Sequence, residues 1–115
     1  MVYQGSCHCG KIAFDVQGEL TGAMACNCSM CQRKGARMWF LPQTSLTLHT
    51  PRAAMASYTF NKHVIEHHFC PTCGIHPFGE GKDPKGNPMV AVNINCLENV
   101  DLSDVTISQY DGKHA

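Results

Sequence analysis

The sequence predicts a mainly β fold with one short helix, and three observations support this. Apolar and polar residues alternate in several short runs, which is typical of half-buried strands rather than helices. Turn-forming segments such as KDPKGNP (82–88) separate these runs. Seven of the eight cysteines fall into three tight clusters at metal-ligand spacing, and metal binding would stabilise so small a chain.

Four runs are the predicted strands: KIAFDV (11–16), SLTLH (45–49), MVAVNI (89–94) and VTISQY (105–110). Alternate residues of a strand point to the same side of its sheet. The residues expected to share one face are Ile12, Phe14 and Val16, then Leu46 and Leu48, then Val90, Val92 and Ile94, and finally Val105, Ile107 and Gln109.

The segment SMCQRKG (29–35) predicts the short helix. Ser29 is the expected N-cap, since its hydroxyl can accept a backbone N–H of the first turn. Gly35 is the residue expected to end the helix, because glycine readily adopts the left-handed conformation found there.

Composition narrows the classes of function. A length of 115 residues suits one domain over 1–115. The formal net charge is zero and no basic run is present, so nucleic acid is not an expected partner. The first residues lack a signal-peptide pattern, and no apolar stretch approaches the ~20 residues of a membrane span. We therefore expect a cytoplasmic protein, in which reduced cysteines are metal ligands or catalytic groups before they are disulfides.

The pairs CHC (7–9) and CPTCG (70–74) together predict a closed metal site. Tetrahedral zinc, with Zn–S bonds of about 2.3 Å, places its sulfur ligands about 3.8 Å apart. Alternate strand residues lie about 7 Å apart, so the CHC pair requires a kink that Gly10 can supply, and Gly74 permits the turn after the second pair. Each pair offers two thiolates, and the four predicted ligands are Cys7, Cys9, Cys70 and Cys73. The alternative is that these are ordinary buried cysteines or disulfides.

The segment CNCSMC (26–31) leaves Cys26, Cys28 and Cys31 as a set of three. Three protein ligands with a fourth position for water or substrate is the pattern of a catalytic zinc site. A second structural site, completed by Cys96 or a histidine, explains the spacing equally well. Cys96 itself stands alone at the end of a predicted strand and is interpreted first as a small core residue.

Three histidines flank the CPTCG segment. His67 and His68 precede it, and neighbouring residues of a strand face opposite sides, so both cannot point into one pocket. His76 follows the segment. Each is interpreted first as a polar strand residue or a supporting residue, with proton transfer near a metal as the alternative. His8, between two predicted ligands, is expected in solvent.

Four segments resemble one known family when they are taken together. They are GSCHCGKIAF (5–14), CNCSMCQRKG (26–35), FCPTCGIHPF (69–78) and VNINCLENVDL…YDGKHA (92–115). In this order and at this spacing they resemble the glutathione-dependent formaldehyde-activating enzyme family, whose domain is shared with centromere protein V. The resemblance runs nearly from end to end.

The resemblance implies a zinc-stapled fold of twisted antiparallel sheets, of the β-tent type, with two zinc ions per chain. It assigns Cys7, Cys9, Cys70 and Cys73 to a structural zinc. It assigns Cys26, Cys28 and Cys31 to a catalytic zinc with an open fourth position.

The activity that the resemblance implies is that of a carbon–sulfur lyase. A small thiol such as glutathione adds reversibly to a small aldehyde, formaldehyde in the family, to give S-hydroxymethylglutathione. Three thiolate ligands weaken the Lewis acidity of the metal, which favours holding a thiolate nucleophile over activating water. The alternative function is a non-catalytic zinc-binding module for protein interactions.

Overall fold

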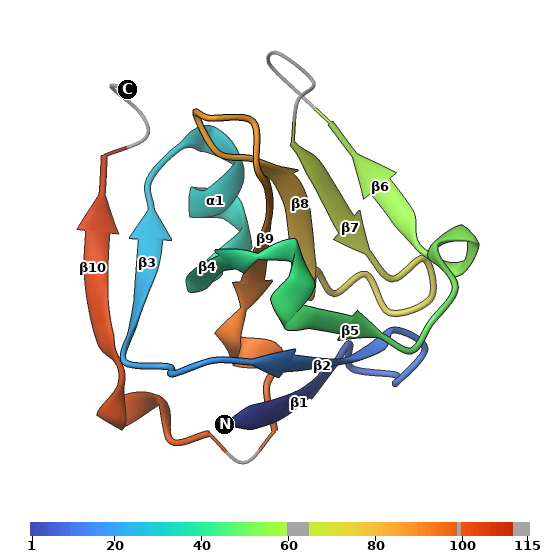
Figure 1. Ribbon diagram of the computed structural model, residues 1–115. Coiled ribbons are helices and arrows are strands. Elements are labelled where there is room, and N and C mark those ends of the chain that lie inside the picture. The colour runs from blue at the N-terminus through green and yellow to red at the C-terminus, as the bar shows by residue number, and fades with distance from the viewer. Residues whose placement is uncertain (60–64, 99, 112–115) are drawn as a thin grey trace.

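The computed structural model describes residues 1–59, 65–98 and 100–111, and in these ranges ten strands form two sheets (Figure 1). The smaller sheet has the order β1-β2-β5 and the larger has the order β10-β3-β4-β9-β8-β7-β6. The strands are β1 (Val2–Ser6), β2 (Ala13–Gln17), β3 (Gly22–Cys26), β4 (Met38–Pro42), β5 (Leu46–Leu48), β6 (Ala56–Tyr58), β7 (Glu66–Phe69), β8 (Phe78–Lys82), β9 (Pro88–Asn93) and β10 (Thr106–Tyr110). In Figure 1 the smaller sheet runs across the direction of β3 and β10.

One α-helix and four short 3-10 helices complete the described elements. They are α1 (Ser29–Lys34), η1 (Gln43–Ser45), η2 (Arg52–Ala54), η3 (Ile94–Cys96) and η4 (Leu102–Asp104). None of these helices has the length and hydropathy that crossing a membrane requires. The predicted mainly β class with one short α-helix is therefore confirmed.

The alternating runs become β2, β5, β9 and β10, and their inward residues build the core. Phe14 and Val16 of β2 are at most 1% exposed, as are Val90 and Val92 of β9. These four belong to one hydrophobic cluster, so residues of both sheets pack in a shared core. Burial of this apolar surface, at roughly 25 cal/mol per Å², is the main force that holds the sheets together.

Burial decreases along the residues that were predicted to share one face of the C-terminal strand. Gln109 is exposed although Val105 is buried and Ile107 is half-buried, because β10 is an edge strand and Gln109 faces a cleft described below. The β9 strand ends at Asn93, so the buried Ile94 belongs to η3 instead. The β3–β10 pair is also parallel, whereas the other strand pairs of the described residues are antiparallel.

The helix α1 follows the prediction at its end but not at its start. Gly35 adopts the left-handed conformation with φ 64°, and its N–H donates to the Cys31 carbonyl. The expected N-cap Ser29 is wrong, because Cys28 occupies the N-cap position and its sulfur accepts the Cys31 N–H at 3.4 Å. A thiol sulfur thus does here what an oxygen does at most N-caps.

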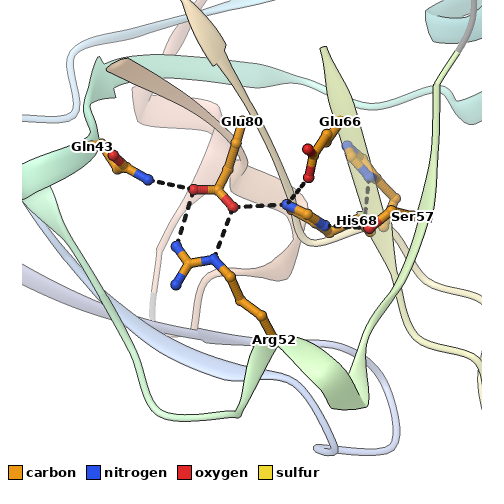
Figure 2. Close-up of polar contacts among 7 residues, drawn as sticks. Gln43, Arg52, Ser57, Glu66, His68 and Glu80 are labelled. Atoms are coloured by element: carbon orange, nitrogen blue, oxygen red, sulfur yellow. Dashed lines mark hydrogen bonds and ion pairs between the residues drawn. The ribbon is translucent and has the colours of Figure 1, made fainter. Parts of the chain in front are cut away.

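A buried polar network joins β6, β7 and β8 to the segment around η2 (Figure 2). His68 is 3% exposed, and its Nδ1 lies 2.8 Å from Ser57 Oγ while its Nε2 lies 2.8 Å from Glu80 Oε1. Glu80 also accepts hydrogen bonds from Arg52 and from Gln43. Burial alone raises the pKa of Glu80, but Arg52, Gln43 and His68 outweigh it and lower the pKa. The network satisfies polar groups that the core would otherwise leave unpaired.

Candidate metal centres

The structure brings the four cysteines of the first predicted site together. Cys7 and Cys9 follow β1, and Cys70 and Cys73 follow β7. The Cys7 and Cys9 sulfurs lie 3.7 Å apart and the Cys9 and Cys70 sulfurs 3.5 Å apart, close to the separation that a tetrahedral zinc site requires. All four sulfurs lie within 4.8 Å of one another. The cluster therefore has the size of one metal site.

Two matching turns produce this geometry. The backbone N–H of Cys7 and that of Cys70 each donate to the carbonyl five residues later, at 3.0 Å and 2.9 Å. Gly10 and Gly74 follow in the left-handed region, with φ 83° and 79°. A side chain strains the backbone at such φ values, which explains why both turns contain glycine. The predicted roles of these two glycines are confirmed.

The donor set of this cluster fits a soft divalent cation such as zinc. Backbone N–H groups point at the sulfurs: Ile12 donates to Cys7 Sγ at 3.3 Å, and Thr72 donates to Cys70 Sγ at 3.3 Å. The pKa of Cys73 is lowered to about 6, mainly by the backbone N–H of Ile75 and next by that of Cys9. The chain thus stabilises the thiolate form of Cys73, which is the form that binds metal.

The second cluster comes from one continuous stretch of chain. Cys26 ends β3, Cys28 caps α1 and Cys31 lies in its first turn. The Cys28 N–H lies 3.4 Å from Cys26 Sγ, and the Cys31 N–H lies 3.4 Å from Cys28 Sγ. The three sulfurs lie within 4.8 Å of one another, so this cluster too can hold a metal ion.

The thiols of the second cluster do not ionise equally. Burial raises the pKa of Cys28, but the Cys31 N–H and the neighbouring thiols outweigh burial and lower it. The pKa of Cys31 is raised to about 12, mainly by burial and next by the contact with Cys28. One thiol of the cluster therefore ionises readily, whereas ionisation of a second thiol is opposed by the first negative charge. A divalent cation between the sulfurs would remove that opposition.

No fourth Cys, His, Asp or Glu joins the second cluster within the part of the chain that the structure describes. Cys96 lies elsewhere, with its sulfur 3.9 Å from the His76 carbonyl oxygen. Burial, followed by the charges of Cys7 and Cys73, raises the pKa of Cys96 to about 11. Cys96 therefore neighbours the four-cysteine cluster and does not complete the three-cysteine cluster.

A cleft of about 780 Å³ opens beside the three-cysteine cluster, and Cys26 and Cys31 form part of its wall. Its volume lies in the ~300–1,000 Å³ range of small-molecule sites. The polar residues that also line it are Asn27, Gln32, Arg37 and Gln109. Sequence reasoning missed Gln32 and Arg37, although both lie within six positions of Cys31. It placed Gln109 on one strand face with Ile107, and both of these residues line the cleft.

The histidines occupy separate environments. His67 and His68 lie on the extended strand β7; His67 lines a second, smaller cavity while His68 joins the Glu80 network. This confirms that the two do not share a pocket. His8 is exposed, as predicted, and His76 is 9% exposed.

Comparisons with known proteins agree with this arrangement. The chain resembles a Rhodobacter sphaeroides protein of known crystal structure, with a TM-score of 0.75 and 29% sequence identity. That likeness covers 91% of this chain and 99% of the other. The sequence model of one family matches residues 2–111, a range that includes both cysteine clusters. The chain therefore belongs to the glutathione-dependent formaldehyde-activating enzyme family.

Proposed function

We propose that this protein is a zinc-dependent carbon–sulfur lyase that forms or cleaves a thiol–aldehyde adduct such as S-hydroxymethylglutathione. The observation that carries the proposal is the three-cysteine cluster at the wall of a cleft of about 780 Å³. The family supports formaldehyde activation and a glutathione substrate.

The two clusters have different roles in this proposal. Each holds one zinc ion, and together with the sheets they form one zinc-binding domain over residues 1–115. The four-cysteine cluster of Cys7, Cys9, Cys70 and Cys73 is structural, because the chain already supplies four ligands. The three-cysteine cluster of Cys26, Cys28 and Cys31 is catalytic, because a fourth position remains for an exogenous thiol.

The reaction forms one carbon–sulfur bond. Zinc would supply a Lewis-acid centre with one exchangeable coordination position. Cys26, Cys28 and Cys31, as thiolates, leave the loaded site with a net negative charge, which favours thiol binding over activation of water. The substrate thiol loses its proton, its sulfur attacks the aldehyde carbon, and the carbonyl oxygen gains a proton to become a hydroxyl. Cleavage of the adduct is the reverse.

The cleft residues match a polar thiol that carries carboxylates. The Arg37 guanidinium can bind a carboxylate with two parallel hydrogen bonds. Gln32 and Gln109 each offer an amide donor and acceptor for peptide groups. Such a wall suits glutathione, which has two carboxylates and two peptide bonds.

The test is the rate of exchange between the free aldehyde and its thiol adduct at equilibrium, since the uncatalysed addition is itself fast. Zinc-loaded protein should increase the exchange observed by NMR for glutathione and formaldehyde. Cys28→Ser should lose this increase. Cys96→Ser, which alters a cysteine outside both clusters, should keep it. Exchange no faster than in buffer would overturn the enzyme proposal, and a protein-interaction module would then be the better explanation.

A further inference from the structure

A second cavity, of about 370 Å³, lies between α1 and the segments on either side of the Cys70–Cys73 turn. It shares no lining residue with the cleft at the three-cysteine cluster. Its wall combines apolar side chains with cationic and imidazole groups, namely Met30, Tyr58, Phe69, Arg33, Lys34, His67 and His76. The proposed lyase reaction uses none of these residues.

His76 presents an unsatisfied acceptor in this cavity. The side chain belongs to a residue that is 9% exposed, and its Nδ1–H donates to the His68 carbonyl oxygen at 2.7 Å. Nε2 therefore carries a lone pair. This nitrogen is buried and has no hydrogen-bond partner among the described residues. A buried polar atom without a partner is unfavourable, and a ligand with a proton to donate would satisfy it.

Lys34 supplies the opposite chemistry. Its Nζ lies 2.9 Å from His67 Nδ1, so the ammonium can donate one proton there and still has two for a ligand. Burial lowers the pKa of Lys34, although the charges of Cys31 and Cys28 partly oppose this. The cavity thus contains a charged donor and a neutral acceptor.

The charged and titratable groups that act on His76 are Lys34, His67 and His68. Burial, followed by the Lys34 charge, lowers the pKa of His76 to about 3, so its imidazole is neutral when the cavity holds no anion. An apolar ligand would leave Nε2 unpaired. The Lys34 charge opposes a metal cation, and the apolar Met30 and Phe69 are poor neighbours for a dianion.

We propose that this cavity binds a carboxyl group, with one oxygen against the Lys34 ammonium and the other sharing a proton with His76 Nε2. A carboxyl group has two oxygens in one plane. The carboxylate and the neutral imidazole together take up one proton from solvent on binding, and this proton lies between the second oxygen and Nε2. The Lys34 contact is a charge-assisted hydrogen bond, the stronger class of such bonds.

The carboxyl group has two possible sources. It belongs either to a free small acid or to the thiol substrate whose sulfur is held at Cys26, Cys28 and Cys31. The second source rests on the proposed function, whereas carboxyl binding by itself does not.

The test uses the full-length, zinc-loaded protein with acetate as the probe, and imidazole ¹⁵N NMR as the readout. Acetate should produce a saturable shift of the His76 Nε2 resonance. Lys34→Met should weaken acetate binding roughly tenfold or more, because it removes a charge-assisted bond. Lys85→Met, which removes an exposed cation that lines neither cavity, should leave the shift of the His76 resonance unchanged. No saturable shift, or equal affinity in Lys34→Met, would overturn the proposal.

A second arm identifies the source and separates this proposal from the lyase activity. Acetate binding should persist in Cys28→Ser, which lacks the proposed catalytic metal site. If the substrate supplies the carboxyl group, glutathione should compete with acetate at His76 and its carboxyl-amidated form should not. If a free acid supplies it, glutathione should leave the His76 resonance unchanged while acetate still binds.

Discussion

The two cysteine clusters use the same ligand atom but differ in how the chain assembles them. Cys9 and Cys70 meet across a separation of 61 residues, whereas the second cluster comes from the six residues 26–31. Two ligands of the first cluster, Cys7 and Cys70, are buried among core side chains, although Cys9 is exposed. The three cysteines of the second cluster are all half-buried, and this cluster borders a cleft. The same chemistry can therefore hold distant segments together in one place and leave a ligand position accessible in the other.

This difference predicts unequal consequences of ligand loss, and the largest effect is expected for Cys73→Ser. A metal that joins distant segments offsets a large loss of chain entropy. Structural zinc contributes roughly 10–16 kcal/mol in small zinc-finger peptides, comparable to the net stability of a whole domain. We expect Cys73→Ser to be largely unfolded at 25 °C by circular dichroism. A melting midpoint close to that of the native protein would show that this cluster does not stabilise the fold.

Cys28→Ser tests the other half of the comparison. This variant should keep a cooperative thermal transition, because the remaining ligands belong to one local segment. Elemental analysis should find close to one zinc per chain after dialysis, against two for the native protein. Cys96→Ser is the matched control and should retain both ions. If Cys28→Ser and Cys73→Ser lost the cooperative thermal transition equally, both clusters would be structural.

Glu80→Gln should reduce the stability of the fold by an amount between those of the changes above and below. Glu80 holds His68 on β7, the strand that leads to Cys70, and its side chain is 14% exposed. We expect a loss of about 1–3 kcal/mol in the free energy of unfolding in urea, the usual cost of an unsatisfied buried polar group. Zinc content at the three-cysteine cluster should not change.

Glu66→Gln is the matched control for this variant. Glu66 lies 3.8 Å from the same imidazole, but its side chain is 60% exposed, so its removal should cost well under ~1 kcal/mol. Equal losses for the two variants would contradict the importance of the buried network.

The smallest expected effect is on the pH dependence of stability. The pKa of Glu80 is below its ordinary value of 4.5, so its ionised form stabilises the fold above that pH. This stabilisation is lost as the pH falls through the lowered pKa. The difference in unfolding free energy between the native protein and Glu80→Gln should therefore shrink below pH 4.5. A difference that stays constant into acid would show that Glu80 acts without its charge.

The sequence predicted the parts of the fold that depend on local pattern. The alternation of Phe14 and Val16 predicted a buried strand face, and Gly35 predicted the end of α1. The predicted runs correspond to β2, β5, β9 and β10, and the other six described strands were missed. Among these, β7 and β8 have the sequences EHHF and FGEGK, which show no apolar alternation. In β8, a side chain at Gly79 would lie 3.2 Å from the Glu66 carbonyl oxygen, so glycine is there to let β7 approach closely. That requirement comes from a neighbouring strand and leaves no local signal.

Spacing alone determined which cysteines could act together, because ligand geometry is short-range and the residue types are restricted. The seven clustered cysteines divide into a set of four, from residues 7–9 and 70–73, and a set of three, from residues 26–31. Only the tertiary structure placed Cys96 beside the first cluster and set Arg37 and Gln109 in one cleft. It also left His76 Nε2 buried beside Lys34. These contacts join segments far apart in the chain, and packing of the two sheets decides which of them meet.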